Sequence, residues 1–177
     1  MAQILAIFLV ISLSFADFVV KSFIELKYKD VIKQKYEESC GASAMATLLN
    51  LDGNNFSEKD ILKDINSTDA ISLYTLSLIA KKHNYLSKSY KINLKILKTI
   101  KIPVIARIAR DRNYPHFVVI KVFKNFVLVL DPNYGKYALS FDEFNKIWTK
   151  YIFIVKLKHP KKIKYNLSAF KYLRDLD

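Results

Sequence analysis

The order of the apolar patterns along the chain constrains the fold most strongly. Five apolar runs typical of strands lie in the C-terminal half of the chain, at residues 104–109, 117–123, 126–130, 136–139 and 151–157. The N-terminal half instead carries patterns typical of helices, at 40–50, at 57–65 behind the cap Ser57, and from Ser72 onward. Helices that precede a set of antiparallel strands indicate an α+β fold.

Shorter segments and the overall composition complete this prediction. Residues 17–33 are expected to form an irregular or β-like lead-in, 93–97 a short helix, and 141–147 a helix capped by Ser140. The chain has 177 residues, 51% of them hydrophobic, and only 3 glycines and 4 prolines. It is therefore long and apolar enough for one domain with a core that needs no disulfide.

The N-terminus resembles an export signal. Residues 4–15 are apolar apart from Ser12 and Ser14, a length that suits a signal-peptide core and is short for a membrane span. Ser14 and Ala16 are small residues at the two positions that a signal peptidase reads. We therefore expect a signal peptide over 1–16, a domain over 17–159, a basic tail over 160–177, and a periplasmic or secreted protein without a stable transmembrane span. An uncleaved anchor or a packed N-terminal helix is the alternative.

The charge of the chain is strongly positive, with 29 Lys and Arg residues against 16 acids and a formal net charge of +13. Such a balance is compatible with nucleic acid, an anionic membrane surface or acidic substrates. However, the lysines are scattered among apolar positions, and no nucleic-acid motif, phosphate-binding glycine loop or zinc-ligand spacing accompanies them. We therefore expect no nucleic-acid partner, no metal and no cofactor.

The single cysteine, Cys40, has a sequence context that favours a reactive thiol. It is followed by Gly41 and by small and apolar residues, which places it in the first turn of a buried helix. The positive end of a helix dipole favours thiolate over thiol. The alternative is a small buried core residue. In an oxidising compartment, where a free thiol is a disadvantage, the retention of Cys40 favours a nucleophile.

Three other residues complete a possible nucleophilic site. His116 opens one strand and Asp131 ends the next, and the two strands are joined around Lys124 and Asn125, so both side chains are expected at the same end of a hairpin. Asp131 can hold one imidazole nitrogen while the other faces Cys40, although an ordinary turn aspartate is the alternative. The side-chain amide of Gln34 can donate to an oxyanion beside the N–H of Cys40.

These motifs resemble a known family. The Q-x5-C-G segment that begins at Gln34, the H-F-V-V strand at His116 and the D-P-N-x-G turn at Asp131 are similar to those of papain-like cysteine peptidases that process double-glycine leaders of bacteriocins. Stand-alone secreted relatives of these domains exist, one of them associated with functional-amyloid secretion. The resemblance covers roughly residues 30–158. Exporter domains usually carry an acidic residue just before the cysteine, where this chain has Ser39.

The resemblance implies a papain-like fold, with N-terminal helices packed on a C-terminal antiparallel sheet and a cleft between the two. It also implies roles for four residues: Cys40 as nucleophile, His116 as base, Asp131 as the orienting carboxylate and Gln34 as oxyanion donor. The expected function is a cysteine peptidase acting on leader or secretion-related peptides, with a secretion system or exporter as a candidate partner. A non-cleaving leader-binding module and a thioester-forming acyl transferase are the alternatives.

Overall fold

The computed structural model describes residues 22–66, 70–110 and 114–158. Its helices are α2 (Phe23–Lys27), α3 (Cys40–Leu51), α4 (Glu58–Ile65), α5 (Leu73–Lys82), α6 (Leu94–Leu97) and α7 (Phe141–Ile147). Its strands are β1 (Tyr85–Lys91), β2 (Val104–Ile108), β3 (His116–Val122), β4 (Phe126–Asp131), β5 (Gly135–Ser140) and β6 (Trp148–Leu157). The order of these elements confirms the predicted α+β class.

The strands form one antiparallel sheet in the order β1-β6-β2-β3-β4-β5. Strands β2 to β5 follow one another as a meander, and β6 returns to pair with both β2 and β1. The β3–β4 hairpin pairs Val122 with Val127, as expected for strands joined around residues 124 and 125. This hairpin is the part of the sheet that carries both His116 and Asp131.

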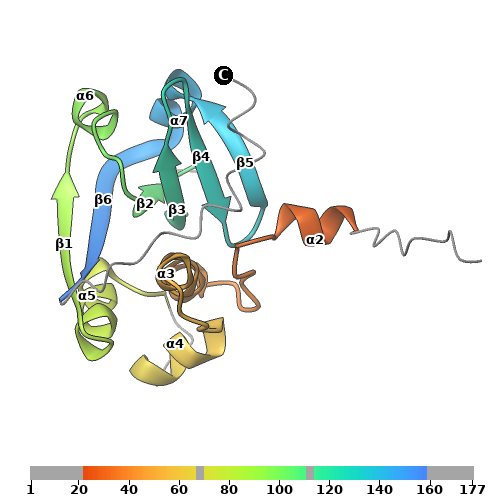
Figure 1. Cartoon of the computed structure of the whole chain (residues 1–177), viewed down its shortest axis with the longest axis vertical. Helices are drawn as coiled ribbons and strands as arrows, with labels where there is room; N and C mark the ends of the chain where they lie inside the picture. Colours follow the sequence, from red (N-terminus) through yellow and green to blue (C-terminus); the bar gives the residue numbers. More distant parts are fainter. Residues whose placement is uncertain (1–21, 67–69, 111–113, 159–177) are drawn as a thin grey trace, which may run out of the picture.

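Both faces of the sheet are covered by helices, which explains why the central strands are apolar at nearly every position. Phe117 and Val119 of β3 belong to the core shared with α3, α4 and α5. Val118 and Ile120, which alternate with them, pack into a second core with residues of α6 and α7. Figure 1 shows α3, α4 and α5 grouped on one side of the sheet, away from α6 and α7.

Two parts of the sequence-based assignment were wrong. The lead-in contains the helix α2, because Ser22 and Glu25 form a capping box that satisfies the N–H groups of the first turn. Strand β1 was not predicted, since most of its side chains are exposed and it lies at the edge of the sheet, where it pairs only with β6. The predicted signal peptide (1–16) and basic tail (160–177) lie outside the described residues.

Helix boundaries elsewhere follow local signals. Ser57 and Ser140 each accept a hydrogen bond from the backbone N–H three residues on, in capping boxes with Asp60 and Glu143. Ser72 and Asn93 cap α5 and α6 in the same way through their side chains. Within residues 22–66, 70–110 and 114–158, no helix has the length and apolar content needed to cross a membrane.

Candidate active site

Cys40 is the first residue of α3, as predicted, and its side chain is partly exposed. The next nine residues of this helix are all buried, so α3 is fixed between the sheet and the other N-terminal helices. As the first helical residue, Cys40 has a backbone N–H without an intrahelical acceptor. The thiol and this N–H group therefore lie together at the positive end of a firmly packed helix.

Gly41 allows close packing beside the thiol. A Cβ atom at this position would lie 2.9 Å from Cβ of Ile71 and 3.5 Å from Cδ2 of Phe117. Ile71 and Phe117 both line the pocket that contains Cys40. The absence of a side chain at Gly41 thus lets two apolar residues approach α3 next to Cys40.

His116 and Asp131 are joined by a hydrogen bond in which Nε2 of the imidazole donates to Oδ1 of the carboxylate at 2.7 Å. The side chain of Cys40 lies close enough to His116 to contribute to the raised pKa of the imidazole. Because Nε2 is engaged by Asp131, Nδ1 is the ring nitrogen left for the sulfur. The structure thus brings together three of the four predicted site residues in one series, from Asp131 through His116 to Cys40.

Asp131 also organises the turn that follows it. Its side chain is fully buried, and Oδ1 accepts hydrogen bonds from the backbone N–H groups of Asn133 at 2.9 Å and Tyr134 at 3.2 Å. The two roles that the sequence suggested for Asp131, a turn aspartate and a partner of His116, are therefore combined in one carboxylate.

The electrostatics of this pair favour the ionised forms. Burial alone would lower the pKa of His116, but hydrogen bonds and charge interactions with Asp131 and Cys40 raise it to about 9. Burial alone would raise the pKa of Asp131, but the hydrogen bond and charge of His116, with the N–H groups of Asn133 and Tyr134, hold it below its ordinary value. At neutral pH the site therefore contains an imidazolium beside a carboxylate.

Gln34 lies close to this centre through its backbone, since its N–H donates to the carbonyl of Pro132, the residue after Asp131, at 3.0 Å. Its side-chain Nε2 donates to the carbonyls of Tyr36 at 3.3 Å and Glu37 at 3.1 Å. Its Oε1 is buried and has no hydrogen-bond partner among the residues that the structure describes. The amide that was predicted to donate to an oxyanion is thus directed into its own loop, and its role stays a prediction.

A buried glutamate that the sequence analysis missed holds this loop in place. Glu58 of α4 is 3% exposed, and its Oε1 accepts hydrogen bonds from the N–H of Lys35 at 2.9 Å, from Oγ of Ser43 at 3.2 Å and from Oγ of Ser39. From the sequence, Glu58 looks like a solvent-exposed acid in the first turn of α4. The spacing of Ser39 and Ser43, one helical turn apart, was the available signal for a shared polar partner.

The pocket beside the thiol has a volume of about 440 Å³. Its lining is mainly apolar and includes two charged side chains, Glu38 and Arg107. The other residues that line it beside Cys40 are Ala70, Ile71, Ser72, Leu73, Tyr74, Pro115 and Phe117. Its lining comes from α3, from the start of α5 and from strands β2 and β3. The expected cleft between the helices and the sheet is therefore present, and Cys40 opens into it.

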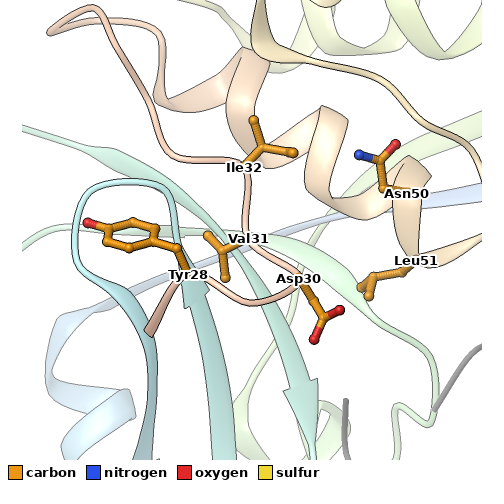
Figure 2. Close-up of a pocket in the computed structure, with 6 residues that line it drawn as sticks. All are labelled: Tyr28, Asp30, Val31, Ile32, Asn50 and Leu51. Atoms are coloured by element: carbon orange, nitrogen blue, oxygen red, sulfur yellow. The ribbon is translucent and has the colours of Figure 1, made fainter. Parts of the chain in front are cut away.

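A second pocket, of about 280 Å³, lies between the segment that precedes Gln34 and the end of α3. Figure 2 shows the six side chains that line it: Tyr28, Asp30, Val31, Ile32, Asn50 and Leu51. None of the four predicted site residues lines this pocket.

Other histidine and aromatic residues have separate environments. His83 caps α5, and its Nε2 lies 2.5 Å from Oδ2 of Asp64, so it links α5 to α4. Trp148 is buried in the second core, whereas Tyr114 is exposed. Asp69, Asp111 and His159 lie outside the described residues. In the part of the chain that the structure describes, no group of three or more His, Cys, Asp or Glu side chains could hold a metal ion.

Known proteins share both the sequence pattern and the fold. The model of the peptidase C39 family matches residues 28–160. The chain is 32% identical over 149 residues to "Probable functional amyloid protease FapD" of Pseudomonas fluorescens, a match that covers 77% of this chain and 64% of that protein. It is 28% identical over 135 residues to the lactococcin-G-processing and transport ATP-binding protein LagD of Lactococcus lactis subsp. lactis, covering 73% of this chain and 19% of LagD. The chain thus spans less than two thirds of these relatives.

Solved structures agree with this assignment. A double glycine motif protease from an AMS/PCAT transporter, in complex with the leader peptide, superposes with a TM-score of 0.64 and 25% identity over 72% of this chain and 90% of that chain. The peptidase domain of Streptococcus ComA superposes with a TM-score of 0.65 and 18% identity, over 72% of this chain and 97% of that domain. The fold is therefore the papain-like fold of such domains, and the chain belongs to the peptidase C39 family, with residues 28–160 as its cysteine peptidase domain.

Proposed function

We propose that this protein cleaves peptide bonds with Cys40 as the nucleophile, His116 as the general base and acid, and Asp131 as the residue that orients His116. The observation that carries the proposal is the His116–Asp131 hydrogen bond with His116 beside Cys40, at the edge of the pocket that Cys40 lines. A nucleophile next to a base that an orienting carboxylate holds is the arrangement that covalent acyl transfer requires.

The chemistry follows from this arrangement. With His116 in its imidazolium form, the thiol proton already resides on Nδ1, and the Cys40 sulfur attacks the peptide carbonyl, giving a tetrahedral oxyanion near the N–H of Cys40. When the C–N bond breaks, His116 returns the proton to the leaving amine and a thioester remains on Cys40. A water molecule, deprotonated by His116, then attacks the thioester, the C–S bond breaks, and the acid product leaves.

The pocket supports a peptide substrate with small and apolar side chains. Ile71, Leu73 and Phe117 provide apolar contact surface in the pocket that Cys40 lines, and the missing side chain at Gly41 lets Ile71 and Phe117 pack close to α3. One relative of known structure is described as a double glycine motif protease, and a curated relative is named as a functional amyloid protease. We infer that the substrate is a secretion-related precursor with a small-residue cleavage site.

Purified protein and a Cys40→Ala variant, incubated with peptides that carry a Gly-Gly cleavage site, test this proposal. We expect cleavage by the wild type and none by the variant, because Cys40 is the only thiol in the chain. At pH 6, iodoacetamide should label the native thiol faster than the thiol of the denatured protein, since the imidazolium of His116 favours the thiolate. Undiminished cleavage by Cys40→Ala would end the assignment of the nucleophile.

Product analysis separates the two alternative functions. Added hydroxylamine or a primary amine competes with water for the thioester, so dominant amide product at low amine concentration would indicate an acyl transferase. A protein that binds the peptides without any product would be a binding module. We expect the hydrolysed acid as the main product.

We also propose that the protein is exported by a cleaved signal peptide over residues 1–16. The support is the apolar segment of signal-peptide length with Ser14 and Ala16 before the cleavage point. In a secreted or periplasmic location, the peptidase would encounter its precursor substrate during or after the export of that substrate.

A further inference from the structure

The two oxygens of Asp131 have different partners. Oδ1 accepts from His116 and from two backbone N–H groups of the following turn. Among the described residues, Oδ2 accepts only from the hydroxyl of Tyr137, at 3.0 Å. Because Asp131 is fully buried, loss of this donor would leave a carboxylate oxygen unpaired in the interior, which is costly.

Tyr137 is held in place by a second residue. It lies on β5, opposite Val129 of β4 and two residues from the Asp131–Gly135 pair. Nη2 of Arg110 donates a hydrogen bond to the Tyr137 oxygen at 2.7 Å. The guanidinium of Arg110 also lies over the rings of Tyr134, at 4.8 Å, and Tyr137, at 5.3 Å.

The direction of these hydrogen bonds is fixed by the chemistry of the groups. A guanidinium can only donate, and an ionised carboxylate can only accept. The single phenolic hydrogen of Tyr137 must therefore point to Asp131, while its lone pair receives the N–H of Arg110. The hydrogen bonds therefore converge on the carboxylate: Arg110 donates to Tyr137, Tyr137 donates to Oδ2 of Asp131, and His116 donates to Oδ1.

We propose that Tyr137 and Arg110 are positioning residues that keep the Asp131 carboxylate oriented toward His116 and ionised. The proposal rests on the function proposed above, because it concerns the same His116 and Cys40. Neither residue touches the thiol in the structure, so both act through Asp131. A group that hydrogen-bonds to a functional side chain fixes its orientation, and for the partners of metal-ligating side chains the loss of such a group lowers affinity or activity by about 10- to 100-fold.

Several charged and titratable groups around the Asp131 carboxylate influence its ionisation. His116 of β3 and Tyr137 of β5 contact it directly. Arg110, after β2, interacts with its charge, as does Tyr28, after α2, whose hydroxyl is bonded to the carbonyl of Asn133. Cys40 of α3 lies beyond His116. Loss of the Tyr137 hydroxyl or of the Arg110 charge removes a group that stabilises the anion, so either change should raise the pKa of Asp131.

The experiment is a comparison of Tyr137→Phe with the wild type. The change removes one oxygen atom and keeps the ring between its neighbours. With a peptide that the wild type cleaves, we expect kcat to fall about tenfold with KM nearly unchanged, as for a second group that orients a reacting side chain. The acid limb of the kcat/KM profile and the pH midpoint of iodoacetamide labelling of Cys40 should both move to higher pH.

Tyr85→Phe is the matched control. It also removes one buried, hydrogen-bonded phenol, since Tyr85 accepts from Asn54 at 2.8 Å, but it lies on β1 and contacts no residue of the Asp131 series. We expect it to lower stability without moving either pH profile. Arg110→Gln, at an exposed position, should move both profiles in the same direction as Tyr137→Phe by a smaller amount.

The outcomes separate this proposal from the one on which it rests. An active wild type with unchanged profiles in Tyr137→Phe and Arg110→Gln overturns the positioning role alone. If Tyr137→Phe does not fold, Arg110→Gln decides by the same two profiles. A wild type that neither cleaves peptides nor shows enhanced thiol labelling overturns both proposals.

Discussion

Gln34 can stabilise the oxyanion only if its side-chain amide exchanges a hydrogen bond to its own loop for one to the oxyanion. In the structure, both hydrogens of its amide are directed to carbonyls of its own loop. An oxyanion is a stronger acceptor than a peptide carbonyl, so a charged intermediate can compete for one of these hydrogens. The backbone of Gln34 is already tied to Pro132, and this contact keeps the amide near the reacting centre.

Gln34→Ala should therefore lower kcat by about 10²-fold or more, the usual effect of losing one oxyanion donor. Steady-state kinetics and urea unfolding on the same sample check this prediction. Glu37→Ala, which changes an exposed side chain of the same loop, serves as the control and should leave kcat unaltered. A normal rate in Gln34→Ala would mean that backbone N–H groups alone hold the oxyanion.

The His116–Asp131 pair should also make stability depend on pH. The pKa of His116 is about 9 in the folded protein against an ordinary value of 6.5. The folded state therefore binds the proton more tightly than the unfolded state, and the pair stabilises the fold fully below pH 6.5. As the pH rises from 6.5 through 9, this contribution is lost, with a slope of at most about 1.4 kcal/mol per pH unit.

Urea unfolding at pH 6, 7.5 and 9 measures this dependence. His116→Gln should flatten the decline, because the variant has no imidazole to titrate. Asp131 stays ionised across the whole window, since its pKa is held below the ordinary value of 3.8. An equal decline in the wild type and the variant would show that other groups cause it.

The connection between β4 and β5 depends on Gly135. Its φ angle is +76°, in the left-handed region that favours glycine. A Cβ atom there would lie 2.7 Å from the carbonyl oxygen of Lys27, at the end of α2. This close approach joins α2 to the edge strand β5, the strand that also carries Tyr137.

Gly135→Ala should destabilise the protein for two reasons: the left-handed backbone conformation and the contact of the new Cβ atom with Lys27. Gly53→Ala is the matched control, because Gly53 has a φ of +90° but no atom within 4 Å of its Cβ position. We expect Gly53→Ala to cost about 1 kcal/mol, and Gly135→Ala to cost about 1 kcal/mol or more beyond that. Equal unfolding free energies of the two variants would show that Lys27 moves aside freely.

The whole chain contains segments whose role the peptidase domain does not define. If residues 1–16 are a signal peptide, expression of the full chain in a bacterium with a general secretory pathway should yield a mature protein that begins at Asp17. Intact-mass measurement of the exported protein checks this. Ala16→Tyr should block the cleavage, because signal peptidase requires a small residue at that position, and a wild-type protein that retains Met1 would indicate an anchor or a packed helix.

The sequence alone determined those features that depend on neighbours along the chain. Capping residues and apolar periodicity predicted α3 to α7 and five of the six strands. A hairpin joined around residues 124 and 125 placed His116 and Asp131 at one end of two adjacent strands, and the structure shows them in contact. The position of Cys40 at the start of a buried helix followed from the small residues after it.

Only the tertiary structure decided the contacts between residues that are distant in sequence. Glu58 meets Ser39 across 19 positions, and Arg110 meets Tyr137 across 27. Strand β1 exists because β6 returns to pair with it, not because of its own pattern. Local periodicity fixes which face of an element is apolar, but it carries no information about which polar group will face another once the elements pack. Burial then selects the pairs, since a buried carboxylate must find donors wherever the fold supplies them.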